Sequence, residues 1–207
     1  VASKAETIIL SVKPQFYAEV IAEIKNDVRE DQIIITIAPG KTLAWLKEQF
    51  GKNVKIVRTM PNTPALVGAG MTAACPNEYM TKEEIAYVLT LLESFGRVEI
   101  IPERLMDTVV SVSGSSPAYV FMFIEAMADA AVSGGMPRAQ AYQFAAQAVL
   151  GSAKMVLETG KHPGELKDMV CSPAGTTIEA VRVLEEKGFR SSVIEAMKTC
   201  EEISKSM

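Results

Sequence analysis

A turn and three hydroxyl side chains stand directly before an apolar repeat in the stretch Ser172–Ala180, which reads SPAGTTIEA. Ile178, Val181 and Leu184 recur at near-helical spacing, which predicts a helix that begins at about Thr176. The first amides of a helix have no partner inside it, and the helix dipole adds partial positive charge there. These amides and the hydroxyls of Thr176 and Thr177 could therefore bind a small carboxylate. The alternative is that Ser172 or Thr176 only caps the helix.

Other side chains that could do chemistry have simpler interpretations. His162 is the only histidine, which excludes a multi-histidine metal site, and it precedes Pro163 at a predicted helix start, where capping is favoured over acid catalysis. Glu125 and Asp129 share a helix face, either as an acid/base pair or as a solvated or interface stripe. The three cysteines, Cys75, Cys171 and Cys200, lack CxxC spacing. They predict reduced thiols in a cytoplasmic protein, with no disulfide and no zinc site.

Gly68–Ala73 matches the G-x-G-x-x-A dinucleotide pattern, but its context is wrong. The pattern must follow a strand and open a helix. Asn62-Thr63-Pro64 lies upstream, and Pro76-Asn77 would interrupt a helix downstream. The glycines are therefore predicted to form a turn before a strand.

The elements that would position a ligand alternate between strand and helix in the first half of the chain. Buried strands are predicted at 7–12, 33–37 and 54–57, with helices at 16–24 and 43–50 between them. This order indicates right-handed crossovers in a parallel sheet, whose ligands bind beyond the carboxyl ends of the strands. Those ends are Val12-Lys13-Pro14, Ala38-Pro39-Gly40 and Thr59-Met60-Pro61-Asn62, although each alone could be an ordinary turn.

The pattern changes after Pro102. Before it, we expect strands at 71–75 and 98–101, with a helix between them that opens on a capping box at Thr81 and stops at Gly96. After it, helices alone are expected, including the apolar 118–132 and the alanine-rich 137–158. We therefore predict an α/β domain at 1–102 and an all-helical domain at 103–207. The surplus apolar face of the second is expected to pack against another subunit.

Composition excludes several classes of protein. The chain has 207 residues, of which 48% are hydrophobic and 22% charged, as in a soluble globular protein. Its net charge of -4 gives no indication of a nucleic-acid or anionic-membrane partner. We see no signal peptide and no apolar run near 18 residues.

Several separated blocks resemble the pyrroline-5-carboxylate reductase family. The most specific are HPGELKD at 162–168, followed by SPAGTT at 172–177 and Leu184-Glu185. SGSSPAY at 113–119, MPNTP at 60–64 and Ala38-Pro39-Gly40 are also similar to that family, which usually has a small residue in place of Pro39. The resemblance covers essentially the whole chain after its first residues.

The resemblance implies a Rossmann-like domain, a helical dimerisation domain, and homodimers that can form larger assemblies. It also implies hydride transfer from NADPH or NADH to the C=N bond of 1-pyrroline-5-carboxylate, giving L-proline, the last step of proline biosynthesis. On this basis the cofactor is expected at Pro61 and Asn62, and in a cleft lined by Ser11, Val12, Lys13, Pro14, Ala38, Pro39 and Gly40. The substrate carboxylate is expected at Ala174, Gly175, Thr176 and Thr177. Thr177, Ser113 and Ser115 are candidates to protonate the product nitrogen.

The chain departs from the family pattern at Val110, Gly160 and Ala174, where many or some members have threonine, a carboxylate and glycine. The family also begins with a strand and a glycine-rich loop that should precede Val1, so we expect weak NADPH binding by this chain.

Two other functions stay open. One is a non-catalytic helical oligomerisation protein with a relic half-sheet. The other is a related small-acid dehydrogenase, such as a β-hydroxyacid dehydrogenase.

Overall fold

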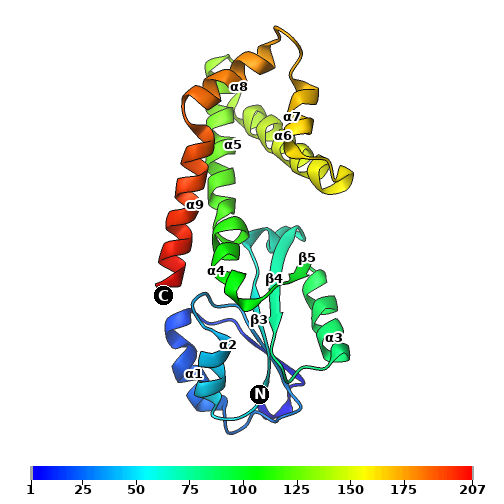
Figure 1. Cartoon of the computed structure of the whole chain (residues 1–207), viewed down its shortest axis with the longest axis vertical. Helices are drawn as coiled ribbons and strands as arrows, with labels where there is room; N and C mark the ends of the chain where they lie inside the picture. The colour runs from blue at the N-terminus through cyan, green and yellow to red at the C-terminus, as the bar shows by residue number, and fades with distance from the viewer. Residues whose placement is uncertain (1, 207) are drawn as a thin grey trace. The chain divides into compact units, whose positions relative to one another are not determined.

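The computed structural model describes residues 2–206 and divides the chain into two compact units. The first unit contains residues 1–117 and 197–207, and the second contains residues 118–196. Each unit is described by itself below, with the elements labelled as in Figure 1.

The first unit is built on a five-stranded sheet in the order β1-β2-β3-β4-β5. Its strands are β1 (Thr7–Leu10), β2 (Ile33–Thr36), β3 (Lys55–Met60), β4 (Gly70–Pro76) and β5 (Gly96–Ile100). The first three are parallel, with Ile9 opposite Ile35 and Ile35 opposite Val57. The predicted Rossmann-like sheet is therefore confirmed, and it places the carboxyl ends of β1, β2 and β3 along one edge.

β4 departs from the parallel arrangement, because it runs antiparallel to β3. A parallel neighbour needs a crossover of a dozen or more residues, usually a helix. Only the short 3₁₀ helix η3 (Thr63–Val67) and a turn at Gly68 separate β3 from β4. Gly68 therefore belongs to a turn that leads into β4, as the sequence predicts. β5 then runs parallel to β4.

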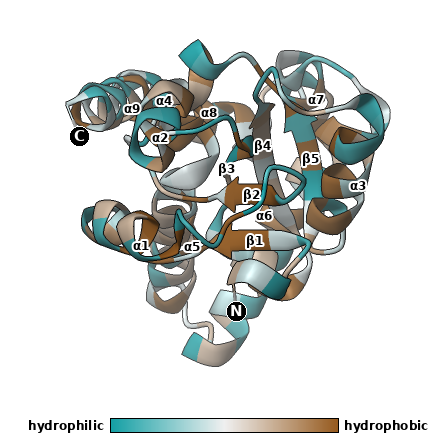
Figure 2. Cartoon of the chain, turned by 90° about the horizontal axis from the view of Figure 1, so that it is seen from below, coloured by the Kyte–Doolittle hydropathy of each residue, from teal (hydrophilic) through white to brown (hydrophobic). Residues whose placement is uncertain are grey.

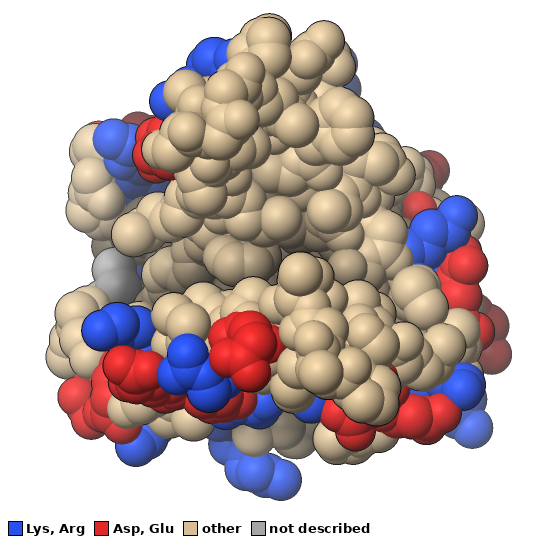
Figure 3. Space-filling view, turned by 90° about the horizontal axis from the view of Figure 1, so that it is seen from above, with Lys and Arg blue, Asp and Glu red and all other residues tan. Residues whose placement is uncertain are grey.

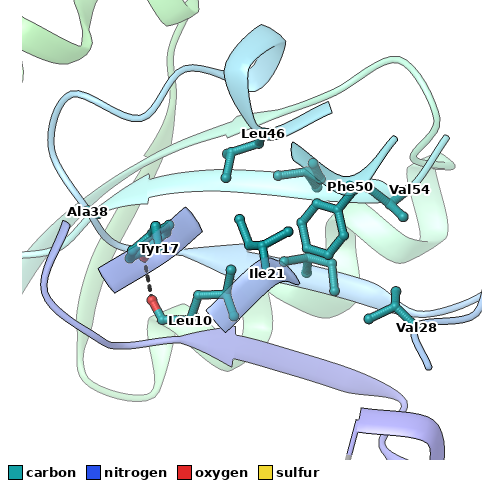
Figure 4. Close-up of a cluster of buried hydrophobic side chains, with 10 residues drawn as sticks. Leu10, Tyr17, Ile21, Val28, Ala38, Leu46, Phe50 and Val54 are labelled. Carbon is teal, nitrogen blue, oxygen red and sulfur yellow. Dashed lines mark hydrogen bonds between the residues drawn. The ribbon is translucent and has the colours of Figure 1, made fainter. Parts of the chain in front are cut away.

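Helices cover both faces of this sheet. α1 (Tyr17–Ile24) and α2 (Leu43–Phe50) pack with Ile34 and Ile56 on one face. Figure 2 shows the apolar colours of β1 and β2, and Figure 4 shows Tyr17 and Ile21 of α1 beside Leu46 and Phe50 of α2. α3 (Lys82–Glu93) packs through Val88 and Leu92 against Ile33, Ile35 and Val57 on the other. Both faces of β2 are thus buried, which explains why this strand is apolar at consecutive positions.

The two ends of α3 compare differently with the sequence prediction. Thr81 and Glu84 form the predicted capping box, in which each side chain accepts a hydrogen bond from the other residue's amide. The prediction that this helix stops at Gly96 is wrong. The helix ends at Glu93, and Gly96 is the first residue of β5. Its φ is 156°, and a Cβ there would lie 2.1 Å from the Gly70 carbonyl oxygen, so only glycine fits this close strand contact.

Short helices also belong to the first unit, several of them after β5. The first unit contains the short helices η2 (Pro14–Phe16), η4 (Glu103–Leu105) and α4 (Met106–Val109), and a single π-helical turn, η5 (Val110–Gly114). Met106 is fully buried against Met60 and Cys75 at the sheet end. The last turns of α9 (Phe189–Lys205) also belong here, since Ser204 donates to the Asp107 carboxylate at 2.7 Å. Among the described residues, the N-terminal 3₁₀ turn η1 (Ala2–Lys4) completes this unit.

The second unit is entirely helical within the described chain. It contains nearly all of α5 (Ser116–Ser133), together with α6 (Arg138–Thr159), α7 (Pro163–Val170), α8 (Thr176–Glu186) and the first turns of α9. The rings of Phe123 on α5 and Phe189 on α9 lie 6.0 Å apart. The helix that was predicted to begin at Thr176 is confirmed as α8.

Much apolar surface in this unit is exposed. Large exposed side chains on α5, α6 and α7 include Phe121, Met122, Phe144, Leu150, Met155, Leu157, Met169 and Val170. The helical stretch Glu103–Ser133 is also long and apolar enough, by length and composition alone, to cross a membrane. This stretch does not stand out in the sequence as an uninterrupted apolar run, because Glu125 and Asp129 divide α5.

Candidate functional site

The first predicted cofactor segment follows β1. Ser11, Val12 and Lys13 are exposed, and Pro14 opens the short helix η2. Lys13 has an extended backbone, with φ -64° and ψ 149°, which ends the strand and turns the chain into the helix. The segment therefore presents backbone and one cationic side chain at the carboxyl edge of the sheet.

The second segment, Ala38-Pro39-Gly40, follows β2 and leads into α2. Ala38 is buried, and Gly40 has a φ of 72°, the left-handed conformation that glycine adopts without steric cost. Thr42 then caps α2 by accepting the Trp45 amide at 3.1 Å. The loop is thus a tight turn between the strand end and the helix.

Tyr17 joins these two segments, and Figure 4 shows its hydrogen bond to Leu10. Its hydroxyl donates to the carbonyl of Leu10, the last residue of β1, at 2.5 Å. It also accepts the amide of Ile37, directly before Ala38, at 3.2 Å. Sequence reasoning missed Tyr17, because its partners lie 7 and 20 positions away. The only signal was a polar aromatic residue among the apolar positions of a predicted helix.

The third segment contains Pro61 and Asn62, after β3. The Asn62 side chain accepts the Met71 amide at 2.9 Å and donates to the Ser113 carbonyl at 3.0 Å. Ser113 lies in the π-helical turn η5, a distortion that is frequent at functional sites. Its own hydroxyl donates to the Val109 carbonyl at 3.3 Å. The structure therefore brings Asn62 and Ser113 together.

The charge of this edge suits an anionic cofactor. Residues 11–14, 38–42 and 61–62 contain two lysines, Lys13 and Lys41, and no acidic residue. Three strand ends and a left-handed glycine also allow close approach of a ligand. The described residues therefore fit a phosphate-bearing dinucleotide.

The predicted carboxylate site lies in the second unit, between α7 and α8. The Gly175 amide donates to the Ser172 carbonyl at 3.0 Å, closing a turn with Pro173 at its second position and Ala174 at its third. Ala174 is the one non-glycine residue with positive φ among the described residues, at 56°. Most residues avoid this conformation, so backbone strain lies within the predicted site, at Ala174.

The start of α8 differs from a simple capped helix. Its N-cap is Gly175, which has no side chain, so neither Ser172 nor Thr176 caps the helix. A Cβ at Gly175 would lie 2.3 Å from the Ser172 hydroxyl. The first amides of α8 are therefore left without a side-chain acceptor from the cap, as a site for a carboxylate requires.

Two other candidates have structural roles. His162 is the N-cap of α7, and its Nδ1 accepts the Gly164 amide at 3.0 Å, so the capping interpretation is confirmed. Asp129 forms an exposed ion pair with Arg138 on α6. This pairing favours a surface role for Asp129 over acid/base work with Glu125.

Comparison with known proteins gives a consistent picture. Residues 103–207 match the family model for pyrroline-5-carboxylate reductase dimerisation, and residues 1–40 match that for NADP oxidoreductase, coenzyme F420-dependent. The chain is 62% identical to a pyrroline-5-carboxylate reductase of Escherichia coli (strain K12) over 207 residues, which is all of this chain and 77% of that protein.

Solved structures agree with the sequence comparison. A Plasmodium falciparum pyrroline carboxylate reductase with NADP bound superposes with a TM-score of 0.92 at 34% identity, covering 99% of this chain and 78% of that one. A pyrroline-5-carboxylate reductase from Coxiella burnetii gives the same TM-score and identity, covering 99% and 77%.

Proposed function

The chain belongs to the pyrroline-5-carboxylate reductase family, and from this premise we propose that it reduces 1-pyrroline-5-carboxylate to L-proline, using NADPH. A single observation carries the assignment of the substrate site: the uncapped start of α8, where Gly175 leaves the first amides without a side-chain acceptor. A small carboxylate suits this position by charge and by hydrogen bonding. The non-catalytic and β-hydroxyacid alternatives gain no support from the family match.

The cofactor would be held by the strand-end segments of the first unit. Ser11–Pro14 and Ala38–Gly40 supply backbone and Lys13, and Pro61 and Asn62 would lie near the nicotinamide. NADPH supplies the hydride, and the chain's own residues supply binding and orientation. NADH is the alternative donor, as expected from the resemblance.

The substrate would be held by Ala174, Gly175, Thr176 and Thr177. When the ring carbon accepts the hydride, the ring nitrogen must take a proton. The Thr177 hydroxyl is the candidate donor in this segment, and Ser113 is the candidate on η5. Because the Ser113 hydroxyl already donates within its helix, Thr177 is the stronger assignment.

An assay of NADPH oxidation that depends on 1-pyrroline-5-carboxylate tests this function. Thr177→Val removes the hydroxyl at nearly constant volume, and we expect kcat to fall about 10²-fold, the usual range for loss of a proton donor. Thr90→Val is the matched control, because Thr90 lies on α3 and donates only to its own helix at Ala86. No oxidation by the wild-type protein, or equal loss in both variants, would contradict the proposal.

We propose further that the protein is a cytoplasmic homodimer, in which the exposed faces of α5, α6 and α7 pack against a second copy. Two apolar grooves support this proposal. One, of about 420 Å³, lies between α6 and α7, and the other, of about 460 Å³, lies between α5 and α6. In Figure 3 the charged side chains form separate clusters, and large areas between them are uncharged. Three unpaired cysteines suit a reducing compartment.

A further inference from the structure

A buried ion pair lies in the first unit close to the predicted cofactor segments. Arg58 on β3 is only 4% exposed in its side chain, and its Nη1 lies 2.9 Å from Oε1 of Glu103 on η4. A buried guanidinium without a partner would be strongly destabilising. The carboxylate of Glu103 therefore compensates the positive charge of the buried Arg58 side chain.

The same carboxylate oxygen has a second donor. It accepts the backbone amide of Leu43, the first residue of α2, at 2.7 Å. A carboxylate is favoured at a helix N-terminus, because it meets unpaired amides and the positive end of the dipole. Glu103 thus fixes the point where the loop 38–42 enters α2.

The three groups joined by Glu103 lead directly to predicted site residues. Leu43 follows the loop that contains Ala38-Pro39-Gly40, and Arg58 precedes the strand end that continues into Pro61 and Asn62. Glu103 itself opens the helical segment that reaches Ser113, which Asn62 contacts. One carboxylate therefore connects the loop 38–42, β3 and the helical segment that begins at Glu103.

We infer that Glu103 is a positioning residue, whose carboxylate holds the loop 38–42 against β3 in the geometry that binds NADPH. The inference rests on the proposed function, since NADPH is the ligand concerned. Glu103 need not touch the cofactor. It acts through the Leu43 amide and the Arg58 guanidinium.

A matched control lies at the other end of the same strand. Lys55, the first residue of β3, pairs with Glu84 on α3 at 2.5 Å, with side chains 22% and 24% exposed. Like Glu103, Glu84 joins β3 to a helical element and accepts a backbone amide, that of Thr81, at 2.9 Å. Its loss should destabilise the domain without disturbing the carboxyl ends of the strands.

The test compares Glu103→Ala, Glu103→Gln and Glu84→Gln by fluorescence titration with NADPH, steady-state kinetics and thermal melting. We expect Glu103→Ala to raise the Kd for NADPH about tenfold, and to change the KM for 1-pyrroline-5-carboxylate by less than about twofold. Glu103→Gln should have a smaller effect, because its amide oxygen can still accept the Leu43 amide. Glu84→Gln should lower the melting temperature but leave the Kd within about twofold. Wild-type affinity in Glu103→Ala, or equal weakening in Glu84→Gln, would overturn the inference.

A double variant covers the case in which Glu103→Ala does not fold. Arg58→Met with Glu103→Met leaves no unpaired charge, but it still removes the acceptor of the Leu43 amide. We expect it to fold, to bind NADPH more weakly than the wild type, and to exchange the Leu43 amide hydrogen faster in the absence of cofactor. Unchanged affinity and exchange would contradict the inference. A wild-type protein that binds NADPH without reducing the substrate would contradict the proposed function instead, and these affinities would still decide the role of Glu103.

Discussion

The side-chain amide of Asn62 donates to the backbone carbonyl of Ser113 at 3.0 Å, across 51 positions of the chain. The same side chain accepts the Met71 amide at 2.9 Å. Asn62 thus ties the end of β3 to the π-helical turn on one side and to the start of β4 on the other. These two segments contain residues predicted separately, for cofactor binding and for proton donation.

Replacing Asn62 by alanine should therefore weaken both stability and cofactor binding. The change leaves the Met71 amide and the Ser113 carbonyl without their partner, which should lower the free energy of unfolding by about 1–3 kcal/mol. We also expect the Kd for NADPH to rise in Asn62→Ala. Asn77→Ala is a suitable control, because Asn77 makes equivalent backbone contacts with Ile56 and Val54 at the amino end of β3, opposite the end that leads to Asn62. If only stability changed in Asn62→Ala, this residue would be purely structural.

Tyr17→Phe should loosen the segments that follow β1 and β2. The substitution removes the donor to the Leu10 carbonyl and the acceptor of the Ile37 amide, and we expect about 1–3 kcal/mol of destabilisation by urea unfolding. NADPH titration should show weaker binding. An affinity equal to that of the wild type would exclude a role for this contact in cofactor binding.

The Tyr17 phenol should also make the free energy of unfolding depend on pH. Burial raises the pKa of the Tyr17 phenol above its ordinary value of 10.0. Above pH 10 the unfolded chain loses this proton while the folded protein keeps it, so stability should fall as the pH rises beyond the unfolded pKa. In Tyr17→Phe that contribution to the fall should be absent. Parallel alkaline slopes of the unfolding free energy in the two proteins would contradict this assignment.

Ala174→Gly should stabilise the protein. Ala174 has φ 56°, a conformation that destabilises an alanine by about 1–2 kcal/mol. Glycine adopts it without steric cost, but it loses more conformational entropy on folding. We expect a net gain of about 0.5 kcal/mol in thermal unfolding. Gly175→Ala should have the opposite effect, since its Cβ would lie 2.3 Å from the Ser172 hydroxyl and 3.1 Å from the Ser172 carbonyl. Stabilisation by Gly175→Ala would show that the turn differs from the one described.

The proposed dimer can be tested with Phe144→Glu on α6, where the side chain is 67% exposed. A charge on the exposed apolar face that is proposed to pack against a second copy should shift the protein toward the monomer in sedimentation equilibrium. Leu66→Glu is the control, because Leu66 is 87% exposed but lies on η3 of the first unit. A wild-type monomer that floats with lipid vesicles would instead indicate that the apolar helices bind membranes.

Local patterns were sufficient to predict the alternating strands and helices, the start of α8 and the cap at His162, because neighbouring residues determine these features. The direction of β4 depends on the short connection through η3, and the apolar periodicity of the strands does not indicate strand direction. Tyr17 and Glu103 could not be found from local patterns, because their roles arise from contacts between distant elements. Glu103, for example, lies 60 positions from Leu43. The π-helical turn at 110–114 likewise has no local signature.

A crystal structure of the protein with NADP and L-proline would test the central claim most directly. The account predicts that the proline carboxylate accepts hydrogen bonds from the first amides of α8, at Thr176 and Thr177, with the ring nitrogen toward the Thr177 hydroxyl. Proline bound with its carboxylate away from these amides would contradict it.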